Sequence, residues 1–282
     1  MLLTETTIVS AFYPLKVSKY DIGKYRAWIK NFCKFQGAIV IFTTEVFALE
    51  LYQWRKSLLH LTQIIVRPFD SFAMTCPSML AFWQKQHPMD PDKNIHSYEL
   101  YAMWALKQEL VRISINSNKF QSKWFIWCDI GIQRYSSLQS FYSHFPSEVE
   151  RICQPGRMAF LELDRIPESF VNNWIESKPM EYPIPPITLG AGCIVGDIDA
   201  WKEFGEAYKD MLKEFALREW FAGKESDVFF AILMEKKTKP FRLFHAKQFG
   251  NPLIPGIEWM SFPPMLGGSI DAEVDTRFEP DD

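Results

Sequence analysis

The segment WFIWCDIGIQR, residues 124–134, joins an apolar run to residues that could bind a ligand. Trp124 to Cys128 are apolar at every position, as expected for a central strand buried on both faces. Asp129 follows where such a strand meets solvent, and a carboxylate there can hold Mg²⁺ or Mn²⁺, which often bridge to substrate phosphates. Gly131 leaves room for a phosphate or sugar to approach the backbone. An Asp-x-Gly turn that simply closes a strand accounts for the same residues.

Lys107 lies in the stretch HSYELYAMWALKQELV, residues 96–111, whose apolar positions recur at helical spacing. We expect a long helix from about Ser97 to Ile115. This helix leads into the strand that ends at Asp129, where a cation could face an anionic ligand. A solvated surface lysine is the alternative interpretation of Lys107.

The first third of the chain alternates between strand-like and helix-like segments. TTIVSAFY (residues 6–13), GAIVIFTT (37–44) and QIIVRPF (63–69) are predicted strands. A helix with Ser18 as its N-cap and a second helix from Glu45 to Leu58 are predicted between them. Right-handed crossovers of this kind build a parallel sheet covered by helices on both faces, with ligands beyond the carboxyl ends of the strands. The candidate positions at those ends are Ser10 to Phe12, Thr43 to Glu45 and Asp129 to Gly131.

Composition narrows the class of protein. The chain has 282 residues, of which 48% are hydrophobic, enough for a substantial buried core. Its formal net charge of −3 gives no electrostatic case for nucleic acid as a partner. Five cysteines without a CxxC pair fit neither a disulfide framework nor a zinc site. We expect a cytoplasmic protein without a transmembrane segment, and a peripheral membrane contact stays open.

Four blocks of the sequence occur in an order that resembles a known family. TTIVSAFY, IVIFTTE, IHSYELYAMWALKQELV and WFIWCDIGIQR are similar to the successive blocks of the HtrL/YibB family, which resembles GT-A nucleotide-sugar glycosyltransferases. The match covers most of the chain and is strongest up to Arg134. The resemblance implies an α/β, GT-A-like (Rossmann-like) fold with a mainly parallel central sheet flanked by helices. It also implies transfer of a sugar from a nucleotide-sugar donor, UDP-linked, to a glycan or other hydroxyl acceptor.

The resemblance further implies one domain over residues 1–270. Its nucleotide-binding half would span about 1–135 and its acceptor half about 136–270. The segment DAEVDTRFEPDD, residues 271–282, is acidic and is expected to be a flexible, solvated tail.

The metal site implied by the resemblance centres on Asp129. GT-A enzymes carry a DxD motif that binds Mn²⁺ or Mg²⁺ and, through it, the donor diphosphate. Asp129 takes the first acidic place, and Gly131 stands where the second acid would be, as it does in HtrL/YibB-like sequences. A late histidine often completes the metal shell, and His245, after the apolar segment KPFRLF, is the candidate. A structural role is the alternative for a lone histidine.

The resemblance assigns the first strand ends to the donor nucleoside. Ser10, Ala11, Phe12 and Glu45 become candidates for contacts with uracil and ribose. Lys107 matches a basic position ahead of the DxD strand that suits a donor phosphate.

The second half of the chain supplies candidates for the sugar and the acceptor. Gly190, Ala191 and Gly192, within PPITLGAGCIVGD, resemble a glycine-rich turn under the transferred sugar, and a glycine hairpin is an equally physical account. Asp227, with Glu225 in reserve, could position the acceptor or act as its base, because deprotonating a hydroxyl needs a nearby carboxylate. An N-cap role is an alternative for Asp227.

Two other functions stay open at this stage. A non-catalytic relative could bind a nucleotide or sugar, and Gly131 in place of an acid favours this alternative. A metal-dependent nucleotidyltransferase or hydrolase could use a similar sheet. The released product distinguishes the two enzyme classes. A glycosyltransferase releases the nucleoside diphosphate, whereas a nucleotidyltransferase or hydrolase releases pyrophosphate or a nucleoside monophosphate.

Overall fold

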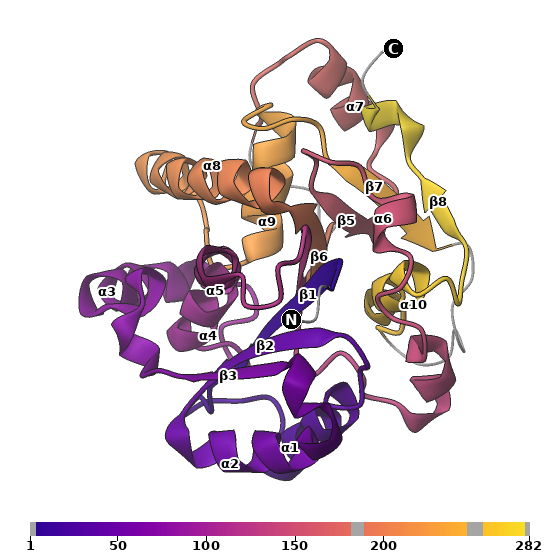
Figure 1. Cartoon of the computed structure of the whole chain (residues 1–282). Coiled ribbons are helices and arrows are strands. Elements are labelled where there is room, and N and C mark those ends of the chain that lie inside the picture. Colours follow the sequence, from indigo (N-terminus) through magenta and orange to yellow (C-terminus); the bar gives the residue numbers. More distant parts are fainter. Residues whose placement is uncertain (1–3, 182–188, 247–255, 280–282) are drawn as a thin grey trace.

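The computed structural model describes residues 4–181, 189–246 and 256–279 (Figure 1). Its strands are β1 (Thr6–Phe12), β2 (Ala38–Thr43), β3 (Thr62–Val66), β4 (Trp124–Cys128), β5 (Ala159–Glu162), β6 (Leu189–Asp197), β7 (Arg242–Ala246) and β8 (Ala272–Val274). Its α-helices are α1 (Ile22–Phe32), α2 (Glu45–Trp54), α3 (Pro77–Gln86), α4 (Tyr98–Ala105), α5 (Lys107–Ser117), α6 (Val149–Ile152), α7 (Glu168–Ile175), α8 (Ile198–Leu217), α9 (Glu225–Met234) and α10 (Phe262–Leu266).

All these strands belong to one sheet of eight strands in the order β3-β2-β1-β4-β6-β5-β7-β8. β3, β2, β1 and β4 are parallel, and β5 is parallel to β7. β6 is antiparallel to both β4 and β5, so its first residues lie at the edge where those strands end. The predicted α/β class with a mainly parallel sheet flanked by helices is confirmed. Strands from both sides of residue 135 pair within this sheet.

The core has one layer on each face of the sheet, and β4 contributes to both. Phe125 and Trp127 pack in the layer under α5, α8 and α9, whereas Trp124, Ile126 and Cys128 pack in the layer that includes α1 and α10. The alternation follows from the pleat, which points successive side chains to opposite faces. This explains why the predicted strand is apolar at every position.

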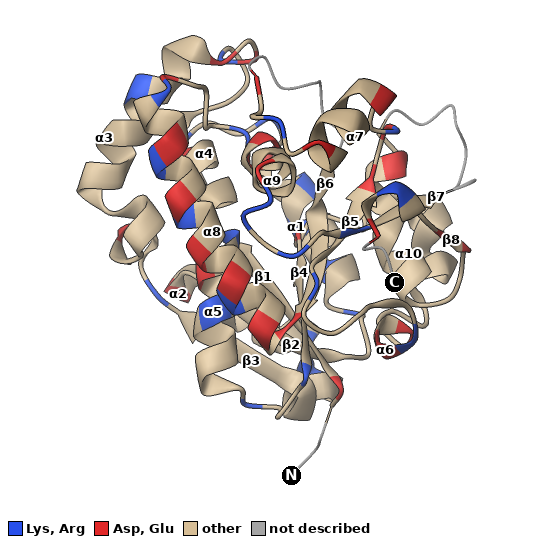
Figure 2. Cartoon of the chain, turned by 90° about the horizontal axis from the view of Figure 1, so that it is seen from above, with Lys and Arg blue, Asp and Glu red and all other residues tan. Residues whose placement is uncertain are grey.

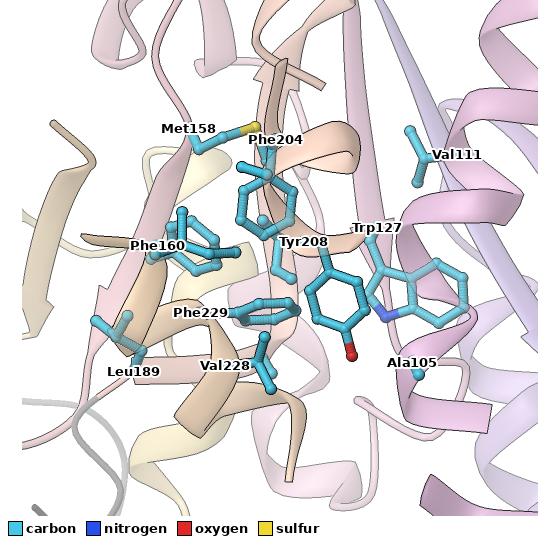
Figure 3. Close-up of a cluster of buried hydrophobic side chains, with 14 of the residues drawn as sticks. Ala105, Val111, Trp127, Met158, Phe160, Leu189, Phe204, Tyr208, Val228 and Phe229 are labelled. Carbon is cyan, nitrogen blue, oxygen red and sulfur yellow. The ribbon is translucent and has the colours of Figure 1, made fainter. Parts of the chain in front are cut away.

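The layer beneath α8 and α9 is rich in aromatic rings (Figure 3). The Phe229 ring centre lies 5.1 Å from that of Phe204 and 5.6 Å from that of Tyr208. Phe160 of β5 completes the group, 5.7 Å from Phe204. Along α8, acidic and basic positions mark the face away from this layer (Figure 2). This packing fixes α9 over the sheet, which matters because α9 carries Glu225 and Asp227.

Three predicted helices have different bounds in the structure, and one of them, α2, ends at Trp54 rather than at Leu58. Asp21, rather than Ser18, caps α1, because its carboxylate accepts a hydrogen bond from the Lys24 backbone N–H at 3.0 Å. The long helix expected from Ser97 is divided at Leu106 into α4 and α5. Ser97 is its N-cap and accepts from the Leu100 N–H at 3.3 Å.

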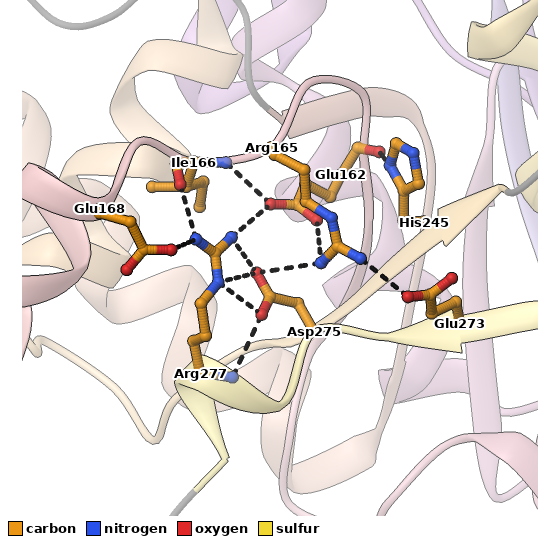
Figure 4. A network of polar contacts seen from close by, with 8 residues as sticks. All are labelled: Glu162, Arg165, Ile166, Glu168, His245, Glu273, Asp275 and Arg277. Carbon is orange, nitrogen blue, oxygen red and sulfur yellow. Dashed lines mark hydrogen bonds and ion pairs between the residues drawn. The ribbon is translucent and has the colours of Figure 1, made fainter.

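The predicted flexible tail is wrong for residues 271–279, which pack onto the domain. β8 pairs with β7, and Phe278 is fully buried. Arg277 donates to both oxygens of Asp275 and to Glu168 (Figure 4). The acidic composition suggested solvation, but these carboxylates have arginine partners. Residues 280–282 lie outside the described residues.

Among the described helices, none is both long enough and apolar enough to cross a membrane.

Candidate functional site

The ammonium group of Lys107 lies at the centre of the site. Its Nζ donates hydrogen bonds to the Ala191 carbonyl oxygen and to Glu225 Oε1, both at 2.8 Å, and it pairs with Asp129 Oδ1 at 3.1 Å. These partners come from β6, from the first turn of α9 and from the end of β4. Four residues that the sequence analysis proposed one by one therefore meet at one atom.

Burial and charge act on Lys107 in opposite directions. Its side chain is only 3% exposed, and burial lowers the pKa of an ammonium group. The carboxylates of Asp129 and Glu225 outweigh the burial, so the pKa of Lys107 is raised overall. The Trp127 ring, with its centre 5.7 Å from Nζ, adds a cation–π contact. Lys107 thus stays charged at neutral pH.

This geometry corrects the predicted role of Lys107. A lysine ammonium has three donors, and Ala191, Glu225 and Asp129 already use them. No donor remains for a phosphate. Lys107 instead holds Asp129 and Glu225 in place, a positioning role.

Asp129 has one oxygen held by the protein and one left open. Oδ1 accepts from the Trp127 indole N–H at 2.7 Å and pairs with Lys107. Within the part of the chain that the structure describes, no group donates a hydrogen bond to Oδ2, and the side chain is 40% exposed. A Cβ added at Gly192 would lie 3.6 Å from Oδ2. The missing side chain of Gly192 therefore keeps the open oxygen accessible.

Asp227 follows Glu225 in the first turn of α9, but its surroundings differ. The helix N-cap is Lys224, so the N-cap alternative for Asp227 does not hold. Burial raises the pKa of Asp227 to about 7; Lys224 lowers it, and Glu225 and Asp90 raise it. A carboxylate with a pKa near neutrality can accept a proton from a hydroxyl, as a general base must.

A group of possible metal ligands escaped the sequence analysis. Ligand atoms of Asp90, Asp92 and His96 lie within 4.8 Å of one another and could hold a metal ion. His96 Nδ1 lies 2.9 Å from Asp90 Oδ2, which also accepts from the Tyr101 hydroxyl at 2.6 Å. Burial raises the pKa of Asp90, but these hydrogen bonds outweigh it, so the pKa is lowered overall. The signal was present in the loop HPMDPDKNIHS, where two acids precede a histidine.

Lys224 connects this acidic group to the Lys107 site. Its Nζ pairs with Asp92 Oδ2 at 2.9 Å, and the next residue, Glu225, pairs with Lys107. Asp90 also acts electrostatically on Asp227. Both clusters therefore face the beginning of α9.

The residues proposed to contact the nucleoside lie in different environments. Ser10 is fully buried, and its Oγ donates to the Cys128 carbonyl oxygen at 2.6 Å, which links β1 to β4. Ala11 and Phe12 are each only 6% exposed. Direct side-chain contacts from these three residues are therefore not supported. Glu45 is exposed in the first turn of α2, at the carboxyl edge of β2, and stays available.

The predicted glycine turn is instead part of strand β6. Gly190 packs closely on β5, since an added Cβ would lie 3.2 Å from Leu161. Ala191 contributes its carbonyl oxygen to Lys107. The preceding segment, residues 182–188, lies outside the described residues. Gly131 lies beside Trp28, because a Cβ added there would be 3.4 Å from the Trp28 ring, and its role of admitting a phosphate or sugar stays a prediction.

His245 is not brought to Asp129. β6 and β5 separate β7 from β4, which puts the two strands roughly 14 Å apart at normal strand spacing. His245 Nδ1 instead lies 3.1 Å from the Glu162 carbonyl oxygen (Figure 4). We therefore do not retain His245 in the metal site.

The comparisons with known proteins give structural likeness but no sequence match. No protein-family model and no curated protein sequence matches the chain. Among solved structures, the apo form of mouse xyloside xylosyltransferase 1 is similar, with 10% sequence identity, coverage of 82% of each chain and a TM-score of 0.42. By its own strand order the chain is an α/β protein with a lysine-centred acidic site at the carboxyl edge of the sheet. The resemblance to the HtrL/YibB family stays a prediction.

Proposed function

We propose that this protein is a glycosyltransferase that moves a sugar from a nucleotide-sugar donor, UDP-linked, to a hydroxyl group of a glycan or similar acceptor. The observation that carries the proposal is the arrangement around Lys107. It fixes one oxygen of Asp129 and leaves the other open, at the sheet edge where α/β proteins bind ligands. The resemblance of the sequence blocks supplies the reaction class.

The donor set suits a divalent cation with oxygen ligands. Asp129 Oδ2 would hold Mn²⁺ or Mg²⁺, and Asp90, Asp92 and His96 are a second set that could do so. When bound, such an ion neutralises charge on the leaving diphosphate as a Lewis acid. Lys107 keeps Asp129 oriented, so the carboxylate needs no rearrangement when ligand arrives.

Asp227 is proposed to receive the proton of the acceptor hydroxyl. Its pKa of about 7 leaves much of the carboxylate ionised at neutral pH and still basic enough for proton transfer. Glu225 is already bound to Lys107, so it positions rather than reacts. The raised pKa of Asp227 favours an enzyme over a non-catalytic binder, because a binder has no use for such a carboxylate. A cytoplasmic location stays part of the proposal.

The test is a screen of nucleotide sugars by thermal shift with and without Mn²⁺, followed by measurement of released nucleoside diphosphate. A donor that binds should raise the free energy of unfolding by about 2.7 kcal/mol when it is present at 100 times its dissociation constant. Asp129→Asn and Asp227→Asn should each reduce transfer by at least 100-fold, whereas Asp210→Asn, on the exposed face of α8, should leave it unchanged. Release of a nucleoside monophosphate or pyrophosphate would instead identify the nucleotidyltransferase or hydrolase. Full activity of Asp129→Asn would refute the proposed site.

The two metal-ligand sets can be separated by Mn²⁺ titration of two variants, with and without UDP. Asp92→Asn should weaken Mn²⁺ binding only if the second set holds the ion, and Asp129→Asn only if the first does. We expect the Asp129 variant to show the loss in the presence of UDP, because donor oxygens would complete the coordination.

A further inference from the structure

Arg134 is an exposed arginine that is nonetheless held in place. Its Cζ atom lies 5.0 Å from the centre of the Trp28 ring and 5.8 Å from that of Tyr20. Its Nε donates to the Gly131 carbonyl oxygen at 3.2 Å. These contacts reduce the rotamer freedom of the side chain before any ligand binds, which lowers the entropy cost of binding.

The terminal nitrogens of Arg134 remain free to bind a ligand. Of the five guanidinium N–H donors, Gly131 uses only the one on Nε, and the other four have no hydrogen-bond partner within the described ranges. No carboxylate of the described chain forms an ion pair with Arg134, in contrast to Arg218, which stacks on Trp220 but pairs with Glu235. The guanidinium therefore presents a planar fork of donors to solvent.

The charges around Tyr20 are mostly positive. Lys24 Nζ and Lys19 Nζ lie 5.5 and 5.6 Å from the centre of its ring. Asp21 is the nearby acid, and its carboxylate caps α1 through the Lys24 N–H, a bond that lowers the pKa of Asp21. Three cations and one capped carboxylate attract an anion.

This positive surface adjoins the Asp129 site through a single turn. The Ile132 N–H donates to the Asp129 carbonyl oxygen at 2.9 Å, and Gly131, inside that turn, accepts from Arg134. The Trp28 ring lies against Gly131, as the 3.4 Å approach of an added Cβ shows. A ligand that contacts both Asp129 Oδ2 and Arg134 needs two parts. One atom would bind at Asp129, and an anionic group farther along the ligand would contact Arg134.

We propose that Arg134, oriented by Trp28 and Tyr20, binds a phosphate group of a nucleoside diphosphate. A guanidinium fork matches two phosphate oxygens in a bidentate arrangement that a lysine cannot reproduce. Arg134 thereby takes the phosphate-binding role that buried Lys107 cannot fill. The inference rests on the proposed function for the identity of the ligand, but binding of a phosphate group can be tested without turnover.

The probe is inorganic pyrophosphate, titrated by calorimetry into the metal-free protein at low salt. Arg134→Gln should weaken binding by at least 10-fold, and Arg134→Lys should recover only part of the loss, because it keeps the charge without the fork. Arg218→Gln is the matched control. Arg218 also stacks on a tryptophan, but its guanidinium already pairs with Glu235, so this variant should bind pyrophosphate as the wild type does. Malonate, a dicarboxylate, should bind more weakly than pyrophosphate.

Equal pyrophosphate affinity in wild type and Arg134→Gln would overturn the inference, as would no binding to wild type or equal affinity for malonate. Loss of pyrophosphate binding in Arg134→Gln together with no sugar transfer by wild type would uphold the phosphate site and refute the glycosyltransferase proposal. The two failures are therefore distinguishable.

Discussion

Replacing Lys107 with methionine removes the charge at the centre of the site but keeps an unbranched side chain of similar length. In the wild type, the ammonium group has partners at 2.8 Å on Ala191 and Glu225 and at 3.1 Å on Asp129. The Glu225 side chain is 8% exposed, whereas that of Asp129 is 40% exposed. The variant would leave a buried carboxylate on α9 without a cation.

The expected cost follows from that buried carboxylate. Removing one partner of a buried ion pair costs about 3 to 5 kcal/mol, because the remaining charge has lost its compensation. Asp129 adds little, since water reaches its carboxylate. We therefore expect Lys107→Met to lower the free energy of unfolding at neutral pH by about 3 to 5 kcal/mol.

The cost should depend on pH in a defined direction. A buried carboxylate without a cation binds a proton more readily in the folded than in the unfolded state, so the folded variant gains stability as pH falls. The destabilisation should therefore shrink between about pH 7 and pH 5. In the wild type the pKa of Lys107 is raised, so its contribution is complete at neutral pH and is lost only as pH rises through that pKa.

The measurement is urea unfolding followed by tryptophan fluorescence. Lys107→Met/Glu225→Gln should recover much of the lost stability, because it neutralises the orphaned carboxylate. Lys213→Met, at an exposed lysine of α8 paired with Asp210, is the control and should show no measurable change. A cost below about 1 kcal/mol for Lys107→Met, or no recovery in the double variant, would refute the buried ion pair.

Three further predictions test the site and the C-terminal segment. Burial raises the pKa of Asp227 to about 7, so Asp227→Asn should be more stable than wild type at pH 8; thermal melts should show this gain fading as pH falls toward 4. Gly192→Ala would place a methyl group 3.6 Å from Asp129 Oδ2 in ordinary contact, so Mn²⁺ titration with UDP should show at least 10-fold weaker binding while the melting temperature is retained. Phe278→Ala should cost about 3 to 5 kcal/mol in urea unfolding, because the ring is fully buried, with its centre 5.1 Å from that of Trp174; a flexible tail would show no cost.

Several elements were predictable because their signals are local. The strand from Trp124 to Cys128 was predicted with its observed bounds, since a strand buried on both faces is apolar throughout. The Asp90 group was equally local, with its three possible ligands inside one loop, but the sequence analysis did not identify it. Its importance lies in its position beside α9, which depends on the Lys224–Asp92 pair.

The sequence alone indicates the α/β alternation, the apolar strand that ends at Asp129, and the residue types available at the sheet edge. Periodicity, propensity and turn chemistry act over a few neighbouring residues, so they can be read directly from the chain. Long-range packing, by contrast, buries Lys107 between two carboxylates and keeps His245 away from Asp129. It also leaves the terminal nitrogens of Arg134 without a hydrogen-bond partner among the described residues. Those outcomes depend on β6 running antiparallel between β4 and β5 and on α9 packing over them. Contacts between residues as distant in sequence as Lys107 and Glu225 have no local signature, because strand order and helix packing are settled by burial of the whole core.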